Sequence, residues 1–383
     1  MSQSEQNILA RRPTWAEIDL NNLAANFNQI KQRVSSTARV LAVVKANAYG
    51  HGAVECARRL AREGADWFGV ALPEEGIELR ASGITQPILC LAGYWPGQAA
   101  ACIQNRLTAV VYRLDMIDAL NRAAANAGVV ADVHVKVDTG MGRLGVRFDQ
   151  LSEFVAALEQ FHSVRIDGVM THLAAADDAS CQPLTRDQIQ RFDDTVTVFR
   201  EHGYRPTHLH LANSAGIFGH RESWGNLVRP GGVLYGLWRD VLSLSTSSPK
   251  LLPVMSLHSR ICLLKWVPAG ETIGYGCTFE ASRRSLIATL PVGYHDGYMR
   301  GLSNRGHVIV RGVFAPVVGR VSMDLTLIDV TGVAGVEVDD QVTLLGWNGE
   351  LKIPAEDLAR IVGTLSYEVT CGVSYRVPRV FIG

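Results

Sequence analysis

Short apolar segments alternate with longer segments of helical spacing between residues 40 and 236. In the helical segment 184–202, Ile189, Phe192 and Val196 recur at steps of three and four and share one helix face. Eight strands alternating with helices predict a parallel sheet. They favour a closed eight-stranded β/α (TIM-like) barrel over an open doubly wound sheet, which stays open as the alternative. The eight apolar segments have the length and the Val, Ile and Leu content of strands: 40–46, 67–71, 87–92, 107–112, 132–138, 164–172, 207–213 and 226–236.

The pattern changes after a polar stretch, STSSPK at 245–250, which reads as a linker. Beyond it the apolar runs are short and punctuated by Gly and Pro, with one helical segment near 354–364. This texture is typical of a mostly-β domain. We therefore expect two domains: a barrel formed by residues 1–250 and a mostly-β C-terminal domain formed by residues 251–383.

Composition excludes several classes of protein. The chain has 37 Lys and Arg against 37 Asp and Glu, so it lacks the basic excess of a nucleic-acid binder. Hydrophobic residues make up 47% of the sequence, enough for a large core. No stretch reaches the roughly 18 apolar residues of a membrane span, and the start of the chain lacks a secretory signal pattern. With seven scattered cysteines that match no metal or redox spacing, a cytoplasmic protein with reduced thiols is expected.

Two generic motifs are weak signals. GMGRLG at 140–145 spells a dinucleotide-binding fingerprint, but the next strand ends in Met170, Thr171 and His172 where that site needs an acid. HLH at 208–210 places two histidines on one strand face, as in some metal-dependent barrel hydrolases. His172 offers a third ligand and no fourth is evident, so a structural pair without metal is favoured.

The segment VVKANAYGHG at 43–52 is more specific. Lys45 follows an apolar strand and precedes a glycine-rich turn, so it is expected at the carboxyl-end mouth of the barrel, where catalytic side chains gather. A lysine held there can have a lowered pKa and form a Schiff base.

Together with other motifs, this segment makes the sequence similar to the alanine racemase family, which it resembles over nearly its whole length. The resemblance rests on long motifs in the family's order: AVVKANAYGHG, KVDTGMGRLG, HLANSAG, RPGGVLYG, GYGCTF, VGYHDG, GRVSMD and SYRVPR. It implies a β/α barrel with a C-terminal β domain and pyridoxal 5'-phosphate as cofactor. The implied reaction is the interconversion of L-alanine and D-alanine, which supplies D-alanine for peptidoglycan. A racemase of serine or of a broader set of small amino acids is the alternative.

The resemblance also assigns roles. Lys45 matches the lysine that binds the cofactor and moves the Cα proton of the D-enantiomer; Tyr275 matches the opposite base, which acts on the L-enantiomer. Arg229 matches the arginine at the pyridine nitrogen, and Arg143 with Met323 the substrate contacts. Lys136 matches a lysine that is carbamylated in several members. The implied cofactor residues are Lys45, Tyr49, Arg143, His172, Asn213, Ser214, Arg229, Gly231, Gly232 and Tyr375, and the implied supporting residues are Lys136, Tyr294, Arg300 and Asp324.

In the family, Tyr275 and its neighbours reach the mouth of the partner subunit, which implies a head-to-tail homodimer with shared active sites. Three residues depart from the common family pattern, namely Gly232, His295 and Ser322, and they put substrate range in doubt rather than reaction class. Two other classes stay open: a metal-dependent barrel hydrolase, and a cofactor carrier without catalysis, against which the presence of both Lys45 and Tyr275 argues.

Overall fold

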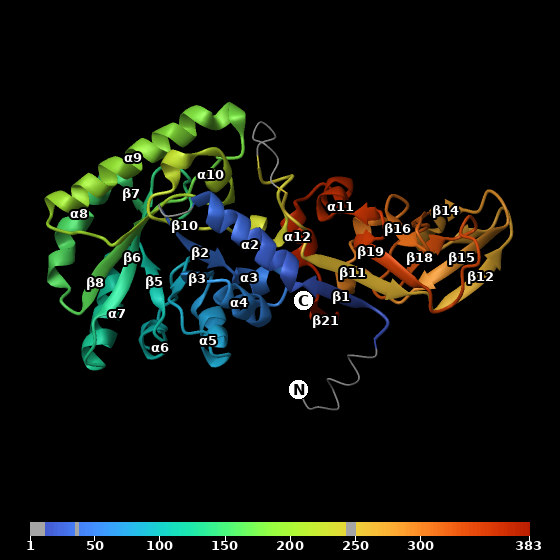
Figure 1. The fold of residues 1–383 in the computed structure, drawn as a ribbon, viewed down its shortest axis with the longest axis horizontal. Coiled ribbons are helices and arrows are strands. Elements are labelled where there is room, and N and C mark those ends of the chain that lie inside the picture. Colours follow the sequence, from blue (N-terminus) through green and yellow to red (C-terminus); the bar gives the residue numbers. More distant parts are fainter. Residues whose placement is uncertain (1–11, 35–37, 243–249) are drawn as a thin grey trace.

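The computed structural model describes residues 12–34, 38–242 and 250–383. It has two parts side by side, a strand-and-helix barrel and a domain dominated by β-strands (Figure 1). The linker expected at 245–250 lies, except for its last residue, outside the described residues.

Within the described residues, the barrel consists of eight parallel strands in the order β10-β2-β3-β4-β5-β6-β8-β9. The ends of this path meet, because the Asn226 amide donates to the Leu209 carbonyl and the Arg229 amide to the Ala212 carbonyl, both at 3.0 Å. The eight-stranded barrel predicted from the alternation is therefore confirmed. Its strands are β2 (Arg39–Val43), β3 (Trp67–Val70), β4 (Ile88–Cys90), β5 (Thr108–Val111), β6 (Ala131–Asp138), β8 (Val164–Met170), β9 (His208–His210) and β10 (Leu227–Val228).

The last apolar segment, 226–236, differs from its expectation, since only its first part is a strand. After β10 the chain turns through Pro230 and Gly231 and forms a short 3-10 turn, Gly232–Tyr235. The remaining apolar residues of this segment are buried there as a turn.

Helices cover the outside of the barrel (Figure 1). The helix expected at 184–202 is α9, and the residues of its apolar face are buried as predicted. Short helical turns, α3 (Lys45–Tyr49) and α10 (Ser214–Gly219), follow strands β2 and β9. The covering helices are α2 (Leu20–Val34), α4 (Ala53–Arg62), α5 (Pro73–Ala81), α6 (Ala99–Gln104), α7 (Leu114–Asn126), α8 (Leu151–Ala156) and α9 (Gln182–Glu201).

The C-terminal domain is mostly β, as expected. Its larger sheet has the order β17-β16-β19-β11-β1-β21, with β20 paired to β19; β12-β15-β18 form a smaller sheet, and β13 pairs with β14. These strands are β11 (Met255–Arg260), β12 (Leu263–Val267), β13 (Thr272–Ile273), β14 (Phe279–Glu280), β15 (Ser285–Leu290), β16 (His307–Val310), β17 (Val313–Pro316), β18 (Thr326–Asp329), β19 (Gln341–Asn348), β20 (Leu351–Ile353) and β21 (Arg379–Ile382).

The N-terminal strand β1 (Trp15–Asp19) belongs to the larger sheet of the C-terminal domain, where it pairs antiparallel with β11 and parallel with β21. The helix expected near 354–364 is α11 (Ala355–Val362), and a second helix, α12 (Ser366–Cys371), follows it. The division of the chain at residue 250 stays a prediction, and β1 shows that both domains draw on the N-terminal half.

A continuous core of buried hydrophobic side chains runs from the barrel into the C-terminal domain. The seven cysteines are all free. No helix in the described part of the chain is both long enough and apolar enough to cross a membrane.

Candidate active site

The turn after β2 presents Lys45 at the carboxyl end of the barrel. Residues 46–49 all have φ of 54°, a left-handed conformation that costs a residue with a side chain roughly 1–2 kcal/mol. The Ala46 amide donates to Glu75 Oε1 at 2.7 Å and holds the turn against α5. The turn ends at Gly50. Only glycine fits at this position, because a Cβ there would lie 2.1 Å from a carbonyl oxygen of α12. Strained backbone of this kind marks functional sites, and here it aims Lys45.

Four cationic side chains converge on this mouth. Burial, and then the charge of Arg143, lower the pKa of Lys45. Burial and the charges of Arg229, Arg143 and Lys45 lower the pKa of Lys136 to about 8. After burial, the same four cations lower the pKa of His172 well below its ordinary value. A mouth with this excess of positive charge disfavours a further cation and attracts anions.

Arg229 is fixed in one orientation at the end of β10. It is 3% exposed, and its guanidinium donates to the carbonyls of Thr171 at 2.8 Å and Leu211 at 2.9 Å. It also donates to Nδ1 of His210 at 3.1 Å and to Nδ1 of His172 at 3.2 Å. A guanidinium does not give up its proton in proteins, so Arg229 is a permanent donor and positive charge in the mouth.

Gly231 and Gly232 after β10 and Ser214 at the start of α10 form a group of residues that we call the cradle. At its two glycines there is room only for backbone. The Gly231 amide donates to Ser214 Oγ at 3.0 Å. A Cβ on Gly231 would lie 2.5 Å from Tyr49 Oη, and a Cβ on Gly232 would lie 2.2 Å from the Tyr367 ring. The departure at Gly232 therefore has a structural reason, since Tyr367 fills the space of a side chain. Buried Ser214 and Tyr49 bring their hydroxyls to the same cradle, and hydroxyls and amides are suited to a phosphate.

Asn213 and His172 are held by hydrogen bonds just after neighbouring strands, β9 and β8. Asn213 Oδ1 accepts from the Gly216 amide at 3.0 Å and caps α10. The His172 carbonyl accepts from Gln188 Nε2 at 3.0 Å, and Gln188 also donates to Thr139 Oγ1 at 3.2 Å. Both residues expected near the cofactor thus lie at the mouth with Lys45 and Arg229.

Arg143 stands in the loop that the dinucleotide-like motif forms. No helix begins inside this motif, because the chain continues into the short strand β7 (Val146–Arg147) beside β6. Asp138 Oδ1 accepts from the amides of residues 140–142 at 2.9–3.0 Å and shapes the loop. Gly145 permits close packing, since a Cβ there would lie 2.5 Å from the Asp138 amide nitrogen. The glycines serve to place Arg143, and a nucleotide reading of the motif finds no support.

The HLH pair lies inside the barrel in a hydrogen-bonded array. Because Arg229 donates to Nδ1 of His210, the His210 proton sits on Nε2 and is donated to His134 Nδ1 at 2.8 Å. Asp167 Oδ2 lies 3.8 Å from His134 Nε2 and 3.6 Å from His208 Nε2. In residues 12–34, 38–242 and 250–383, no group of three His, Cys, Asp or Glu is arranged to hold a metal ion. His210 thus supports Arg229, and His208 lies beside Asp167.

Sequence reasoning missed His134, Asp167, Gln188 and Cys371. The first two lie in strands β6 and β8 with an inward alternation that could have paired them with HLH. The thiol of Cys371 is near enough for the charge of Lys45 to act on its pKa, against the raising effect of burial. Its only sequence signal is its place three residues before the SYRVPR motif.

The structure places Tyr275 away from the mouth of its own barrel, whereas the segment that carries Tyr375 contacts that barrel. Tyr275 lies between β13 and β14, and Figure 1 draws β14 at the end of the C-terminal domain remote from α3. Tyr275 is 73% exposed and Tyr375 is 87% exposed. Tyr375 alone is close in the chain to barrel contacts, because Arg379 donates to the Gly50 carbonyl at 3.0 Å. The other exposed members of this group are Tyr294, Arg300, Met323 and Asp324.

Both halves of the chain match known family models. Residues 18–238 match "Alanine racemase, N-terminal domain", and residues 254–381 match "Alanine racemase, C-terminal domain". The chain is 45% identical over 373 residues to the alanine racemase of Symbiobacterium thermophilum, covering 97% of this chain and 98% of the relative. It is 45% identical over 376 residues to that of Geobacter sulfurreducens, covering 97% of each.

Solved structures agree. The alanine racemase of Clostridium difficile 630 superposes with a TM-score of 0.91 at 37% identity, over 97% of this chain and 96% of that one. The alanine racemase of Streptomyces coelicolor A3(2) superposes with a TM-score of 0.91 at 34% identity, over 99% and 100% of the two chains. The agreement extends through both domains, and this chain belongs to the alanine racemase family.

Proposed function

We propose that this protein interconverts L-alanine and D-alanine by moving the Cα proton between two bases. The observation that carries the proposal is the barrel mouth: Lys45, with a lowered pKa, stands among three further cations, Lys136, Arg143 and Arg229, beside a cradle of hydroxyls and amides. A lysine amine that is deprotonated more readily than usual is both a nucleophile toward a carbonyl and a base.

The residues at the mouth fit pyridoxal 5'-phosphate. When bound, this cofactor supplies an electron sink that acidifies the Cα proton of an amino acid. Lys45 is the residue that would hold it covalently, and Tyr49, Ser214 and the Gly231 backbone would hold the phosphate. A Cβ on Gly231 would lie 2.5 Å from Tyr49 Oη, so only backbone fits beside that hydroxyl. Arg229 faces the same mouth and would donate to the ring nitrogen.

Racemisation needs one base on each face of a planar carbon. We assign the proton on one face to Lys45 Nζ and the proton on the other to the hydroxyl of Tyr275. Arg143, exposed on its glycine loop, would bind the substrate carboxylate. Arg229, held by two carbonyls and two imidazoles, would donate a hydrogen bond to the cofactor ring without protonating it, which would limit electron withdrawal and favour return of the proton to Cα.

The active unit is proposed to be a head-to-tail homodimer. Tyr275 is 73% exposed and belongs to a part of the C-terminal domain remote from α3 in Figure 1, so the Tyr275 that completes a mouth comes from the partner subunit. Met323 and Asp324 would accompany it to the substrate entrance. In the cell, we place the enzyme in the cytoplasm as a source of D-alanine for peptidoglycan.

Lys136 is proposed to be carbamylated in the working enzyme. It is 5% exposed and has two arginines and Lys45 acting on it. Its pKa of about 8 leaves part of the amine neutral near pH 7 and able to react with carbon dioxide. The carbamate would replace a repelling cation by an anion next to Arg143.

The proposal is tested by incubating the protein with L-alanine and pyridoxal 5'-phosphate in deuterated water. We expect D-alanine to accumulate to the racemic ratio, with deuterium at Cα of the product. Protein that is yellow with cofactor should be bleached by borohydride, with the reduced adduct on Lys45. Rapid turnover of L-serine with unchanged L-alanine would contradict the assigned substrate, and racemisation without deuterium would contradict the two-base mechanism.

A further inference from the structure

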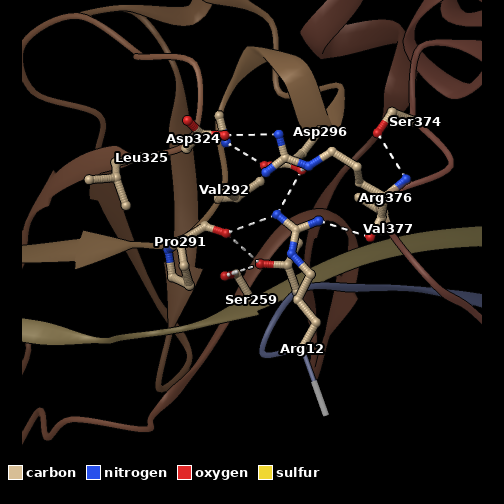
Figure 2. A network of polar contacts seen from close by, with 12 residues as sticks. Arg12, Ser259, Pro291, Val292, Asp296, Asp324, Leu325, Ser374, Arg376 and Val377 are labelled. Carbon is tan, nitrogen blue, oxygen red and sulfur yellow. Dashed lines mark hydrogen bonds and ion pairs between the residues drawn. The ribbon is translucent and has the colours of Figure 1, made fainter. Parts of the chain in front are cut away.

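Asp296 is a fully buried carboxylate in the C-terminal domain with three partners (Figure 2). Its side chain is 0% exposed. Oδ1 accepts from Arg12 Nη2 at 2.7 Å and lies 3.3 Å from Arg376 Nε, while Oδ2 accepts from the Gly293 amide at 3.0 Å. A buried charge is tolerated only when it is paired and hydrogen-bonded, and Asp296 meets both conditions.

The two arginines extend this contact into a network. Arg376 Nη1 donates to Asp324 Oδ1 at 2.8 Å, and Arg12 Nη1 donates to the Arg376 carbonyl at 2.9 Å. The network thus contains two positive and two negative side chains and is balanced in charge. Its members come from residues far apart in the sequence, including the segment that precedes β1 (Figure 2).

Asp296 and Arg376 connect three segments that carry exposed site residues. The Tyr294 amide donates to the Ser322 carbonyl at 3.0 Å, and the Ser374 amide donates to the Asp296 carbonyl at 3.1 Å. The turn that begins at Gly293 approaches segment 322–324 closely because Gly293 has no side chain. A Cβ on Gly293 would lie 2.3 Å from the Ser322 carbonyl oxygen. The segments are 293–296, which presents Tyr294; 322–324, which presents Met323; and 374–376, which presents Tyr375.

These three presented side chains are largely exposed, so the packing around them does not fix their position. Tyr375 is 87% exposed, Met323 51% and Tyr294 41%. Their backbones are instead fixed by the network beneath. Segment 374–376 is also tied to the barrel, since Arg379 donates to the carbonyls of both Gly50 and Ser374.

We propose that Asp296 and Arg376 are positioning residues, which hold Tyr294, Met323 and Tyr375 in the arrangement that the active site requires. The inference rests on the proposed function. Under that function, Tyr375 serves the cofactor phosphate of its own barrel, whereas Met323 serves the entrance in the partner subunit. A single ion-pair network therefore sets two sites at once, and its disruption should weaken cofactor binding and substrate binding together.

The test compares Asp296→Asn and Arg376→Ala with Arg376→Lys as the rescue variant. Arg165→Ala, which breaks an exposed ion pair with Asp132 on the barrel, is the matched control. Hydrogen–deuterium exchange is measured on the full chain, cofactor affinity is measured by titrating the cofactor-free protein with pyridoxal 5'-phosphate, and KM and kcat are measured with L-alanine.

We expect amide exchange in 293–296, 322–324 and 374–376 to accelerate together in both variants, with weaker cofactor binding. KM should rise about tenfold with kcat changed much less, because the displaced side chains serve binding and not the proton transfer. Arg376→Lys should recover most of the loss, and the control should match the wild type. If Asp296→Asn does not fold, Arg376→Ala still tests the inference, because the Arg376 side chain is partly exposed.

Exchange that accelerates in one segment alone, or unchanged cofactor affinity and KM in Arg376→Ala, would overturn the inference. Its failure differs from failure of the proposed function. If the wild type does not racemise alanine, the function is wrong, while the exchange and cofactor measurements still decide whether this network positions the three segments.

Discussion

The barrel mouth and the face of the C-terminal domain hold their functional side chains in opposite ways. At the mouth, Lys136 and Arg229 are 5% and 3% exposed, and the Arg229 guanidinium is held by two carbonyls and two imidazoles. On the C-terminal face, Tyr275 and Tyr375 are 73% and 87% exposed. The mouth is organised within a single chain, whereas the face presents side chains that only another surface can enclose.

The two regions therefore differ in how much stability of the fold their functional residues cost. At the mouth, buried cations and a left-handed turn lower the stability of the fold in order to be ready for a ligand. On the face, the exposed tyrosines cost little stability, and the electrostatic cost falls on buried Asp296, whose carbonyl accepts from the Ser374 amide next to Tyr375. Substitutions in the two regions should therefore separate effects on activity from effects on stability.

The largest effect is expected for Lys45→Ala, which removes the residue proposed to bind the cofactor and to act as one of the two bases. Loss of a covalent and general-base residue should lower kcat by about 10⁴-fold or more. The measurement is racemisation of L-alanine, with borohydride labelling as a second readout. Lys265→Ala, at an exposed position on β12, should keep both activity and labelling. Labelling that persists in Lys45→Ala would refute the assignment.

Tyr275→Phe should lower racemisation by about 10²–10⁴-fold, the usual contribution of a general base. Because the side chain is exposed, the free energy of unfolding should change by no more than about 0.5 kcal/mol. Activity assays and urea unfolding of the same preparation test both statements. A large fall in stability would show that Tyr275 is structural, contrary to the contrast drawn between mouth and face.

In contrast to Tyr275→Phe, Arg229→Gln should lower the stability of the fold strongly. The shorter Gln side chain cannot donate to all four buried partners of the guanidinium, so unfolding should become easier by about 2–4 kcal/mol even without cofactor. Activity should fall as well, through loss of the fixed cation. Urea denaturation of the cofactor-free protein measures the first effect. Unchanged stability would mean that Arg229 is less firmly held than its four contacts indicate.

The smallest effect is expected for Lys136, whose charge should make the free energy of unfolding depend on pH. Its folded pKa is about 8 and its unfolded value is 10.5. Between these values the unfolded chain binds more protons, so the free energy of unfolding should rise with pH, by about 1–3 kcal/mol in total. Below pH 8 both states are protonated and the slope should vanish.

The measurement is urea unfolding of cofactor-free wild type and Lys136→Met at pH 7, 8.5 and 10. The difference between the two proteins isolates Lys136 from the other titrating groups. Added bicarbonate should shrink the difference at pH 7 if the carbamate forms. A difference that does not depend on pH would contradict a buried, charged Lys136.

Much of the barrel could be predicted from sequence because each strand is a short apolar run between helical segments. Lys45 at the mouth followed from the same logic, since the carboxyl ends of parallel strands meet on one face. The preference for an HLH pair without metal stays a prediction. The contacts of His210 with Arg229 and His134 could not be predicted, because these partners come from other parts of the chain.

Other features depend on contacts between distant segments. Strand β1 could not be assigned to the C-terminal sheet, since its partner β11 begins more than 200 residues later. The role of Gly232 required the position of Tyr367, and the network of Asp296 required Arg12 and Arg376 in three dimensions. Roles for Tyr275, Met323 and Asp324 came from family resemblance alone, because an exposed side chain leaves no periodicity.

The central claim is that one active site needs Lys45 from one chain and Tyr275 from another. It is tested by mixing subunits of Lys45→Ala with subunits of Tyr275→Phe, each inactive alone. Random pairing makes half of the dimers mixed, each with one complete site, so we predict recovery of about one quarter of wild-type activity. A mixture that exchanges subunits, confirmed by mass spectrometry with differently tagged chains, and yet stays inactive would contradict the account.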